Sequence, residues 1–169
     1  MLTTNFYRIM LNKMQKDDLL MTVVKPDGTI STTTSSAGLC LHGLGRVLYS
    51  DFGVAGHYGI MFGTGTTPPT MNDYKLESPI IDGTVYATDQ NAPTQGFETD
   101  KAKIYVSHEV KNQGTNPVTI TEAGVFGCQS TASKTSFLLD RTVLDTPVTI
   151  PAGESRTITY AIVFEYPTA

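Results

Sequence analysis

Residues 156–166 read RTITYAIVFEY, and this stretch decides the fold class. Large apolar side chains recur at every second position, and smaller or polar side chains stand between them. Successive side chains of a β-strand point to opposite faces of its sheet, so this alternation is typical of a strand with one buried face. The predicted buried face consists of Ile158, Tyr160, Ile162, Phe164 and Tyr166.

The same alternation occurs earlier, in IYVSHEV (residues 104–110) and VTI (residues 118–120). Segments rich in Asn, Gly and Pro separate these runs, and such residues close β-turns. Along the whole chain we expect roughly eight to ten short strands and no alternating long helices. The sequence therefore predicts an all-β fold, an antiparallel β-sandwich that is jelly-roll-like, with a short N-terminal helix.

The N-terminal helix is expected to begin at Thr3 and Thr4, whose hydroxyl groups are typical helix caps. Phe6, Met10 and Met14 then fall on one helix face. A helix this short is not stable alone in water, so it must dock on another surface. That surface is either the sheet of its own domain or a neighbouring subunit.

A hairpin should follow, because Pro26-Asp27-Gly28 is a strong turn signal between two apolar runs. Its strands are predicted at residues 20–25 and 29–34. We divide the chain into residues 1–34, which we expect to form an assembly contact, and residues 35–169, which form the β-sandwich domain. A short helix followed by a hairpin can reach a neighbouring subunit.

Further strands are predicted at His57–Gly65 and Thr84–Thr88. Between them, Thr64–Leu76 reads as an extended loop, with one turn of helix at its end over Met71–Leu76. Asp89–Asp100 reads as a polar loop long enough to be an exposed contact loop. Both loops are further candidates for contacts with other molecules.

Composition narrows the classes of partner. The 169 residues carry a net charge of −4, which argues against nucleic acid or an anionic membrane as the main partner. The apolar runs are far shorter than a membrane span needs, and no secretory pattern opens the chain. Two cysteines, Cys40 and Cys128, are too few for a disulfide framework and read as buried free thiols. We therefore expect folding in a cytoplasm.

No catalytic, cofactor-binding or metal-binding site is predicted. GTGTT at Gly63–Thr67 lacks the Lys of a nucleotide-binding loop and precedes two prolines instead of a helix. His42, His57 and His108 stand far apart, without the close spacing of zinc ligands, and read as hydrogen-bonded strand residues. Neither cysteine lies in a known nucleophile signature. We therefore expect a protein without enzymatic activity and without a cofactor.

Two charged residues lie within apolar strand runs. Glu122 follows Ile120 in VTITEAGVFG, and Arg141 lies inside FLLDRTVL. A buried charge without a partner costs several kcal/mol, so two interpretations are open. Either Glu122 and Arg141 meet across the two sheets as a bidentate structural ion pair, or both face water on the outside. Neither interpretation makes them catalytic.

Four segments together resemble small structural proteins of tailed-bacteriophage particles. Similar segments occur in many such proteins, and here they span roughly residues 63–164. Ala123 departs from the pattern, which usually has a larger aliphatic residue at that position. The segments are GTGTTPPTMNDYKLESPI (63–80), IYVSHEVKN (104–112), VTITEAGVFG (118–127) and LLDRTVLDTPVTIPAGESRTITYAIVFEY (138–166).

This resemblance implies a β-sandwich that serves as a non-enzymatic structural component of the virion, in the tail, neck or fibre. Its expected partners are other copies of the chain and other virion proteins, and its expected location is the virion, assembled in the host bacterial cytoplasm. One alternative is a capsid decoration protein. Another is a glycan-binding module for host recognition, although the chain has no Trp to form a sugar platform.

Overall fold

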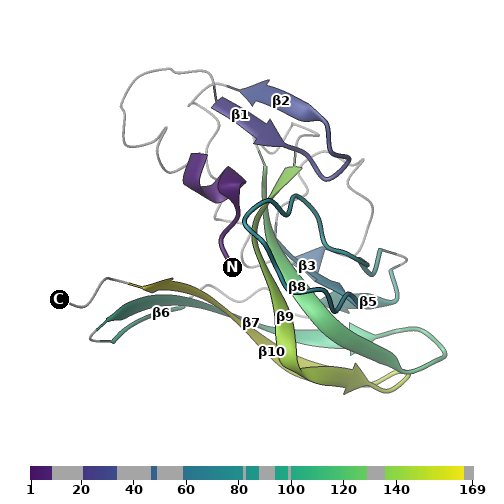
Figure 1. Cartoon of the computed structure of the whole chain (residues 1–169). Coiled ribbons are helices and arrows are strands. Elements are labelled where there is room, and N and C mark those ends of the chain that lie inside the picture. The colour runs from purple at the N-terminus through teal and green to yellow at the C-terminus, as the bar shows by residue number, and fades with distance from the viewer. Residues whose placement is uncertain are drawn as a thin grey trace.

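The computed structural model consists mostly of β-strands, with one short helical segment at residues 4–8 (Figure 1). The predicted all-β class with antiparallel sheets and a short N-terminal helix is therefore confirmed. The structure describes residues 1–8, 21–33, 47–48, 59–81, 83–87, 94–98, 100–128 and 136–165. Its strands are β1 (Met21–Val24), β2 (Ile30–Thr33), β3 (Val47–Leu48), β4 (Gly59–Gly63), β5 (Val85–Ala87), β6 (Thr94–Phe97), β7 (Lys101–Asn112), β8 (Val118–Cys128), β9 (Ser136–Ile150) and β10 (Ser155–Glu165).

Two four-stranded sheets and one hairpin contain these strands. One sheet has the order β3-β4-β8-β9, and we call it the β8–β9 sheet. The other has the order β10-β7-β5, with β6 pairing to the far end of β7, and we call it the β7–β10 sheet. Every described pair is antiparallel except β3 with β4.

The chain crosses between the two sheets three times, from β4 to β5, from β7 to β8 and from β9 to β10. Asn112, which is fully buried at the end of β7, holds the last two crossings together. Its side-chain Nδ2 donates to the carbonyl oxygen of Asn116 at 2.8 Å and to that of Ile150 at 2.9 Å. Its backbone N–H donates to the carbonyl oxygen of Glu154 at 3.0 Å. Asn112 therefore connects the segment between β7 and β8 to the segment between β9 and β10.

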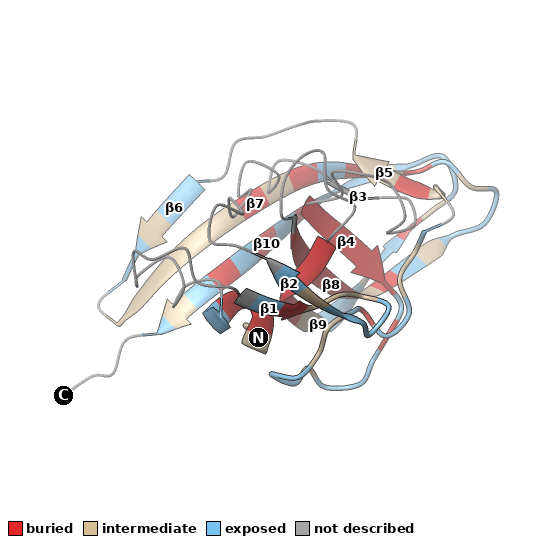
Figure 2. Cartoon of the chain, turned by 90° about the horizontal axis from the view of Figure 1, so that it is seen from above, coloured by how far each residue is buried: buried red, intermediate tan, exposed pale blue. Residues whose placement is uncertain are grey.

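The alternation predicted for β10 is confirmed from Ile158 to Ile162, whereas Phe164 is only half-buried and Tyr166 lies outside the described residues. Ile158, Tyr160 and Ile162 are buried, and the residues between them are exposed, so buried and exposed colours alternate along β10 (Figure 2). The core between the sheets draws on both: Val106 and Val110 come from β7, and other members come from the β8–β9 sheet. The members from that sheet are Ile60, Phe62, Ile120, Ala123, Val125, Phe137, Leu139 and Ile150.

The N-terminal residues pack on this same core. Phe6 and Val23 are both buried in it, so residues 1–8 and β1 dock on their own domain. The prediction that the hydroxyl groups of Thr3 and Thr4 cap the helix is wrong. Instead, Thr3 Oγ1 donates to the Leu138 carbonyl oxygen at 2.6 Å and Thr4 Oγ1 to that of Met71 at 2.8 Å. The helix is tied to its surroundings because these hydroxyl groups reach acceptors outside it.

The predicted hairpin is confirmed as β1 and β2, which pair antiparallel around the Pro26-Asp27-Gly28 turn. Gly28 has φ of 81°, a left-handed conformation that suits glycine. Asp27 Oδ1 accepts hydrogen bonds from the backbone N–H of Thr29 at 2.8 Å and from its hydroxyl at 2.6 Å. Asn5 holds the hairpin by exchanging two hydrogen bonds with the backbone of Val24.

Two local predictions were wrong. Met71–Leu76 contains no helical turn, because Asp73 is held by contacts described below and Leu76 is buried under a sheet. The predicted polar loop Asp89–Asp100 contains strand β6, which pairs with residues 102–105 of β7. Pairing with the long β7 overrides the weak strand propensity of the polar β6 sequence.

Candidate functional site

Residues 64–78, which we call the covering loop, lie over the outer face of the β8–β9 sheet. The loop closes at its base, where Thr64 N donates to the Ser78 carbonyl oxygen at 2.8 Å. Leu76 anchors it in a second apolar cluster, which is completed by Met61, Phe126 and Leu138. The covering loop therefore buries apolar side chains that would otherwise face water.

Glu122 reaches this loop because β8 is irregular. Strict alternation would place Glu122 on the same face as Ile120, inside the core between the sheets. However, the pairing of β8 with β9 shifts register between Ile120 and Glu122. Ile120 remains in the core, whereas the Glu122 carboxylate lies beside Gly63 and Gly65, at the base of the covering loop. Such a bulge re-aims side chains in many sheets.

The fully buried Glu122 carboxylate accepts hydrogen bonds from three backbone N–H groups. Its Oε1 accepts from Gly65 at 3.1 Å and from Ser78 at 2.7 Å, and its Oε2 accepts from Glu77 at 3.1 Å. A Cβ atom at Gly63 or Gly65 would lie 2.5 or 2.6 Å from Oε1. The GTGTT segment therefore encloses a carboxylate of its own chain, and only glycine leaves room for it.

Arg141, on β9, is the cation of this site and is only 3% exposed. Its Nε donates to Glu122 Oε2 at 2.9 Å, and its Nη1 donates to Asp73 Oδ2 at 2.8 Å. Its Nη2 lies 3.6 Å from Glu77 Oε2. Both Glu122 and Arg141 come from one sheet, and Glu122 receives a single guanidinium hydrogen bond. Glu122 and Arg141 therefore form the predicted structural ion pair, but its predicted bidentate geometry across two sheets is wrong, and so is the alternative in which both residues face water.

Asp73 belongs to the site although the sequence analysis did not select it. Thr70 donates to this carboxylate twice, from its N–H at 3.0 Å and from its hydroxyl at 2.7 Å. Burial by itself would raise the pKa of Asp73. The hydrogen bonds from Thr70 and from Arg141 outweigh that effect and hold the pKa below its usual value.

Glu77 is the third carboxylate around Arg141. Its Oε2 accepts from the backbone N–H groups of Thr66 and Thr67, both at 2.8 Å, and the Thr67 hydroxyl donates to Oε1. The hydrogen bonds from Thr67 lower the pKa of Glu77 below its usual value. In the sequence, Thr66 and Thr67 directly before two prolines were the sign of this contact, because consecutive backbone N–H groups in a turn can bind an anion.

Three carboxylates and one guanidinium thus form what we call the charge cluster: Glu122, Arg141, Asp73 and Glu77. Burial opposes the charge on Arg141, but hydrogen bonds to Asp73 and Glu122 outweigh it and raise the pKa of the guanidinium above its usual value. Each carboxylate binds backbone N–H groups of the covering loop. The cluster fastens the loop to the sheet, and this is its evident chemical role.

The other residues considered in the sequence analysis do not join the cluster. His108 lies on β7 and is fully buried between the core residues Val106 and Val110. Cys128 is the last residue of β8. Cys40, His42 and His57 lie outside the described residues. In the part of the chain that the structure describes, no group of three or more His, Cys, Asp or Glu side chains is placed to hold a metal ion.

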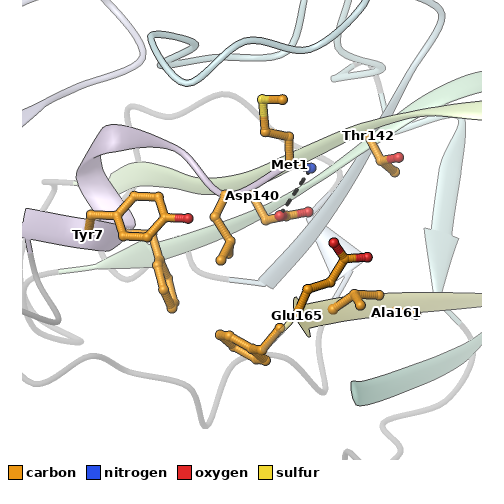
Figure 3. A pocket seen from close by; sticks show the side chains of 10 residues that line it. Met1, Tyr7, Asp140, Thr142, Ala161 and Glu165 are labelled. Carbon is orange, nitrogen blue, oxygen red and sulfur yellow. Dashed lines mark ion pairs between the residues drawn. The ribbon is translucent and has the colours of Figure 1, made fainter. Parts of the chain in front are cut away.

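An open pocket of about 520 Å³ lies between the N-terminal residues and the C-terminal half of β10 (Figure 3). Tyr7 and Val163 are among its apolar lining residues, and Asp140 and Glu165 bring carboxylates to it. Asp140 is already engaged, because it lies 3.2 Å from the Met1 ammonium group and accepts a hydrogen bond from Tyr160.

No helix among the described residues is long and apolar enough to cross a membrane.

Comparison with known proteins adds no relative. No protein-family model, no curated protein and no solved structure matches this chain.

Proposed function

We propose that this chain is a non-enzymatic structural component of a tailed-bacteriophage particle. In this proposal it works by self-association and by docking to other virion proteins in the tail, neck or fibre. One observation carries the proposal: three of the segments that resemble phage structural proteins meet in the charge cluster. GTGTTPPTMNDYKLESPI supplies the covering loop, VTITEAGVFG supplies Glu122, and LLDRTVL supplies Arg141.

The convergence supports a scaffold role, because the shared residues hold a loop in place. Glu122 is fully enclosed, and its oxygens accept from the loop backbone and from Arg141. A catalytic carboxylate must instead reach a substrate. The segments that resemble phage structural proteins therefore contain the residues that hold the covering loop in place. A structural role of this kind is consistent with a component of a particle.

Exposed apolar side chains on the N-terminal segment support the proposed contact by residues 1–34. Ile30 on β2 is 70% exposed and Tyr7 is 46% exposed. Met71, at the outside of the covering loop, is 51% exposed and its carbonyl oxygen binds Thr4. Large apolar side chains that are exposed to this extent are available for protein–protein contact.

The test begins with the mass of the purified protein, measured by light scattering at several concentrations. We expect a mass above that of the single chain. The second measurement is sedimentation of the protein with virion particles made without it. A monomer that sediments with such particles would instead indicate a decoration protein. A monomer that binds no particle would overturn the proposal.

A further inference from the structure

The edges of the two sheets are not protected equally. An exposed edge presents unpaired N–H and C=O groups, so it is a template for a strand from another chain. Proteins protect such edges with short strands, prolines, bulges or covering segments. Among the described strands, β3 has two residues, β5 has three and β6 has four, so these edges are protected by their shortness. The long edge strands are β9 and β10.

The edge of β9 is protected in two places. The first residues of the chain cover one part, where Thr3 N donates to the Leu139 carbonyl oxygen at 2.8 Å and Arg141 N to that of Met1 at 3.1 Å. Farther along, Pro147 lies in the region where β9 shifts register against β8. A covering segment, a proline and a bulge all occur on this one strand.

Among the described residues, no proline, bulge or paired strand protects the free edge of β10. All eleven residues of β10 pair with β7 in one unbroken register, so the strand has no bulge. It contains no proline, and residues 157–164, TITYAIVF, carry no charge. No described strand pairs with the other edge of β10. This strand is long, regular and apolar, and it ends its sheet.

Space for another chain lies beside this edge. The pocket of about 520 Å³ runs along the C-terminal half of β10 and is lined there by Ala161, Val163 and Glu165 (Figure 3). Its opposite wall is formed by N-terminal residues, including Leu2 and Tyr7. Side chains of an added strand would enter a site that is part apolar and part acidic.

We propose that β10 pairs edge to edge with β10 of a second copy of this chain, antiparallel and related by a two-fold axis near Tyr160. This pairing would extend the β7–β10 sheet across two subunits. It deepens the self-association proposed above and rests on it. The main-chain hydrogen bonds would supply affinity, as in other cases of strand addition.

The charges of β10 favour a second copy of this strand as the partner, in the antiparallel orientation. Arg156 lies near one end of β10 and Glu165 at the other, and both are exposed. In the antiparallel arrangement the Arg156 end of one copy meets the Glu165 end of its partner, so opposite charges approach twice. A parallel pair would place like charges together, which is destabilising. Among the described residues, each forms an exposed ion pair, Arg156 with Glu154 and Glu165 with Lys101.

A matched pair of lysine variants tests the edge. Ala161→Lys places a charge at the centre of the proposed contact, next to the partner strand. The two-fold axis near Tyr160 would also bring this lysine close to the same lysine of the second copy. Ala152→Lys places the same charge on an exposed alanine in the turn before β10. We expect Ala161→Lys to raise the dissociation constant by about tenfold or more. Ala152→Lys should leave it unchanged, and circular dichroism should show both variants folded.

A charge exchange tests the direction of pairing. Arg156→Glu and Glu165→Arg should each weaken association, whereas the double variant should restore it, because the opposite charges then meet again. If the wild type is an oligomer that neither Ala161→Lys nor the single reversals weaken, this inference is overturned and self-association through another surface stands. If the wild type is a monomer at every concentration, the second copy and the proposed self-association both fail.

Discussion

The hydroxyl group of Tyr160 on β10 donates a hydrogen bond to the Asp140 carboxylate on β9, and this contact joins the two sheets. Both residues are buried, with exposed fractions of 4% and 5%. Burial, and then the nearby Asp140 carboxylate, raise the pKa of Tyr160 well above its usual value. The contact is a buried polar link between the two sheets.

Tyr160→Phe should lower the free energy of unfolding by about 1–3 kcal/mol, because Asp140 would lose a buried hydrogen-bond donor. Urea unfolding followed by circular dichroism measures this change. Tyr7→Phe is the matched control, since Tyr7 is half-exposed and the same deletion there should cost less than about 0.5 kcal/mol. Equal effects of the two variants would show that the Tyr160 hydroxyl contributes nothing particular.

Alkaline pH should destabilise the wild type through Tyr160. In the unfolded chain this phenol ionises near its ordinary pKa of 10.0, whereas in the folded protein its pKa is raised. The folded state therefore holds the proton more tightly, and the associated stability is fully present below pH 10.0 and is lost as pH rises toward the folded pKa. The free energy of unfolding, measured between pH 9 and 11, should fall more steeply in the wild type than in Tyr160→Phe (about one ionisation of difference).

Glu122→Ala should destabilise the protein by about 3–5 kcal/mol, because it leaves Arg141 and three loop N–H groups with one partner fewer. Glu122→Gln should cost less, since its side-chain oxygen still accepts hydrogen bonds. Urea unfolding measures both changes. Proteolysis within residues 64–78 should accelerate in Glu122→Ala before global unfolding, and an unchanged cleavage rate would contradict the fastening role of the cluster.

Acid should weaken the covering loop through Asp73. Its lowered pKa means that its contribution to stability is present above its ordinary value of 3.8 and is lost as pH falls through the folded value. The destabilisation caused by Asp73→Asn should therefore be largest at neutral pH and should vanish in strong acid. Asp145→Asn is the control, because Asp145 is exposed on β9. A pH-independent effect of Asp73→Asn would refute the ionic role of Asp73.

Gly65→Ala should destabilise the protein by about 2–3 kcal/mol through crowding, because the new Cβ would lie 2.6 Å from Glu122 Oε1. Gly153→Ala provides a contrast. Its site is open, with nothing within 4 Å, but its φ of 76° strains a side chain, so its cost should be about 1 kcal/mol. Gly153→Asn should recover part of that loss, whereas Gly65→Asn should be worse than Gly65→Ala. Thermal unfolding of the four variants distinguishes crowding from strain.

The sequence by itself determined the features that depend on neighbouring residues. The alternation of Ile158, Tyr160 and Ile162 specified a strand with one buried face, because side-chain direction in a strand follows from spacing alone. Pro26-Asp27-Gly28 specified the first hairpin, because turn geometry is a property of a few consecutive residues. The presence of charges in apolar runs also marked Glu122 and Arg141 as residues that need partners.

Only the tertiary structure decided where those partners lie. The register shift between Ile120 and Glu122 depends on pairing with β9, and it moves the carboxylate from the core face to the covering loop. Asp73 and Glu77 lie far from Arg141 along the chain, so no local pattern indicates that they surround it. The strand β6 likewise exists because β7 extends far enough to pair with it. These features rest on contacts between distant segments, whose geometry is set only when the whole chain has folded.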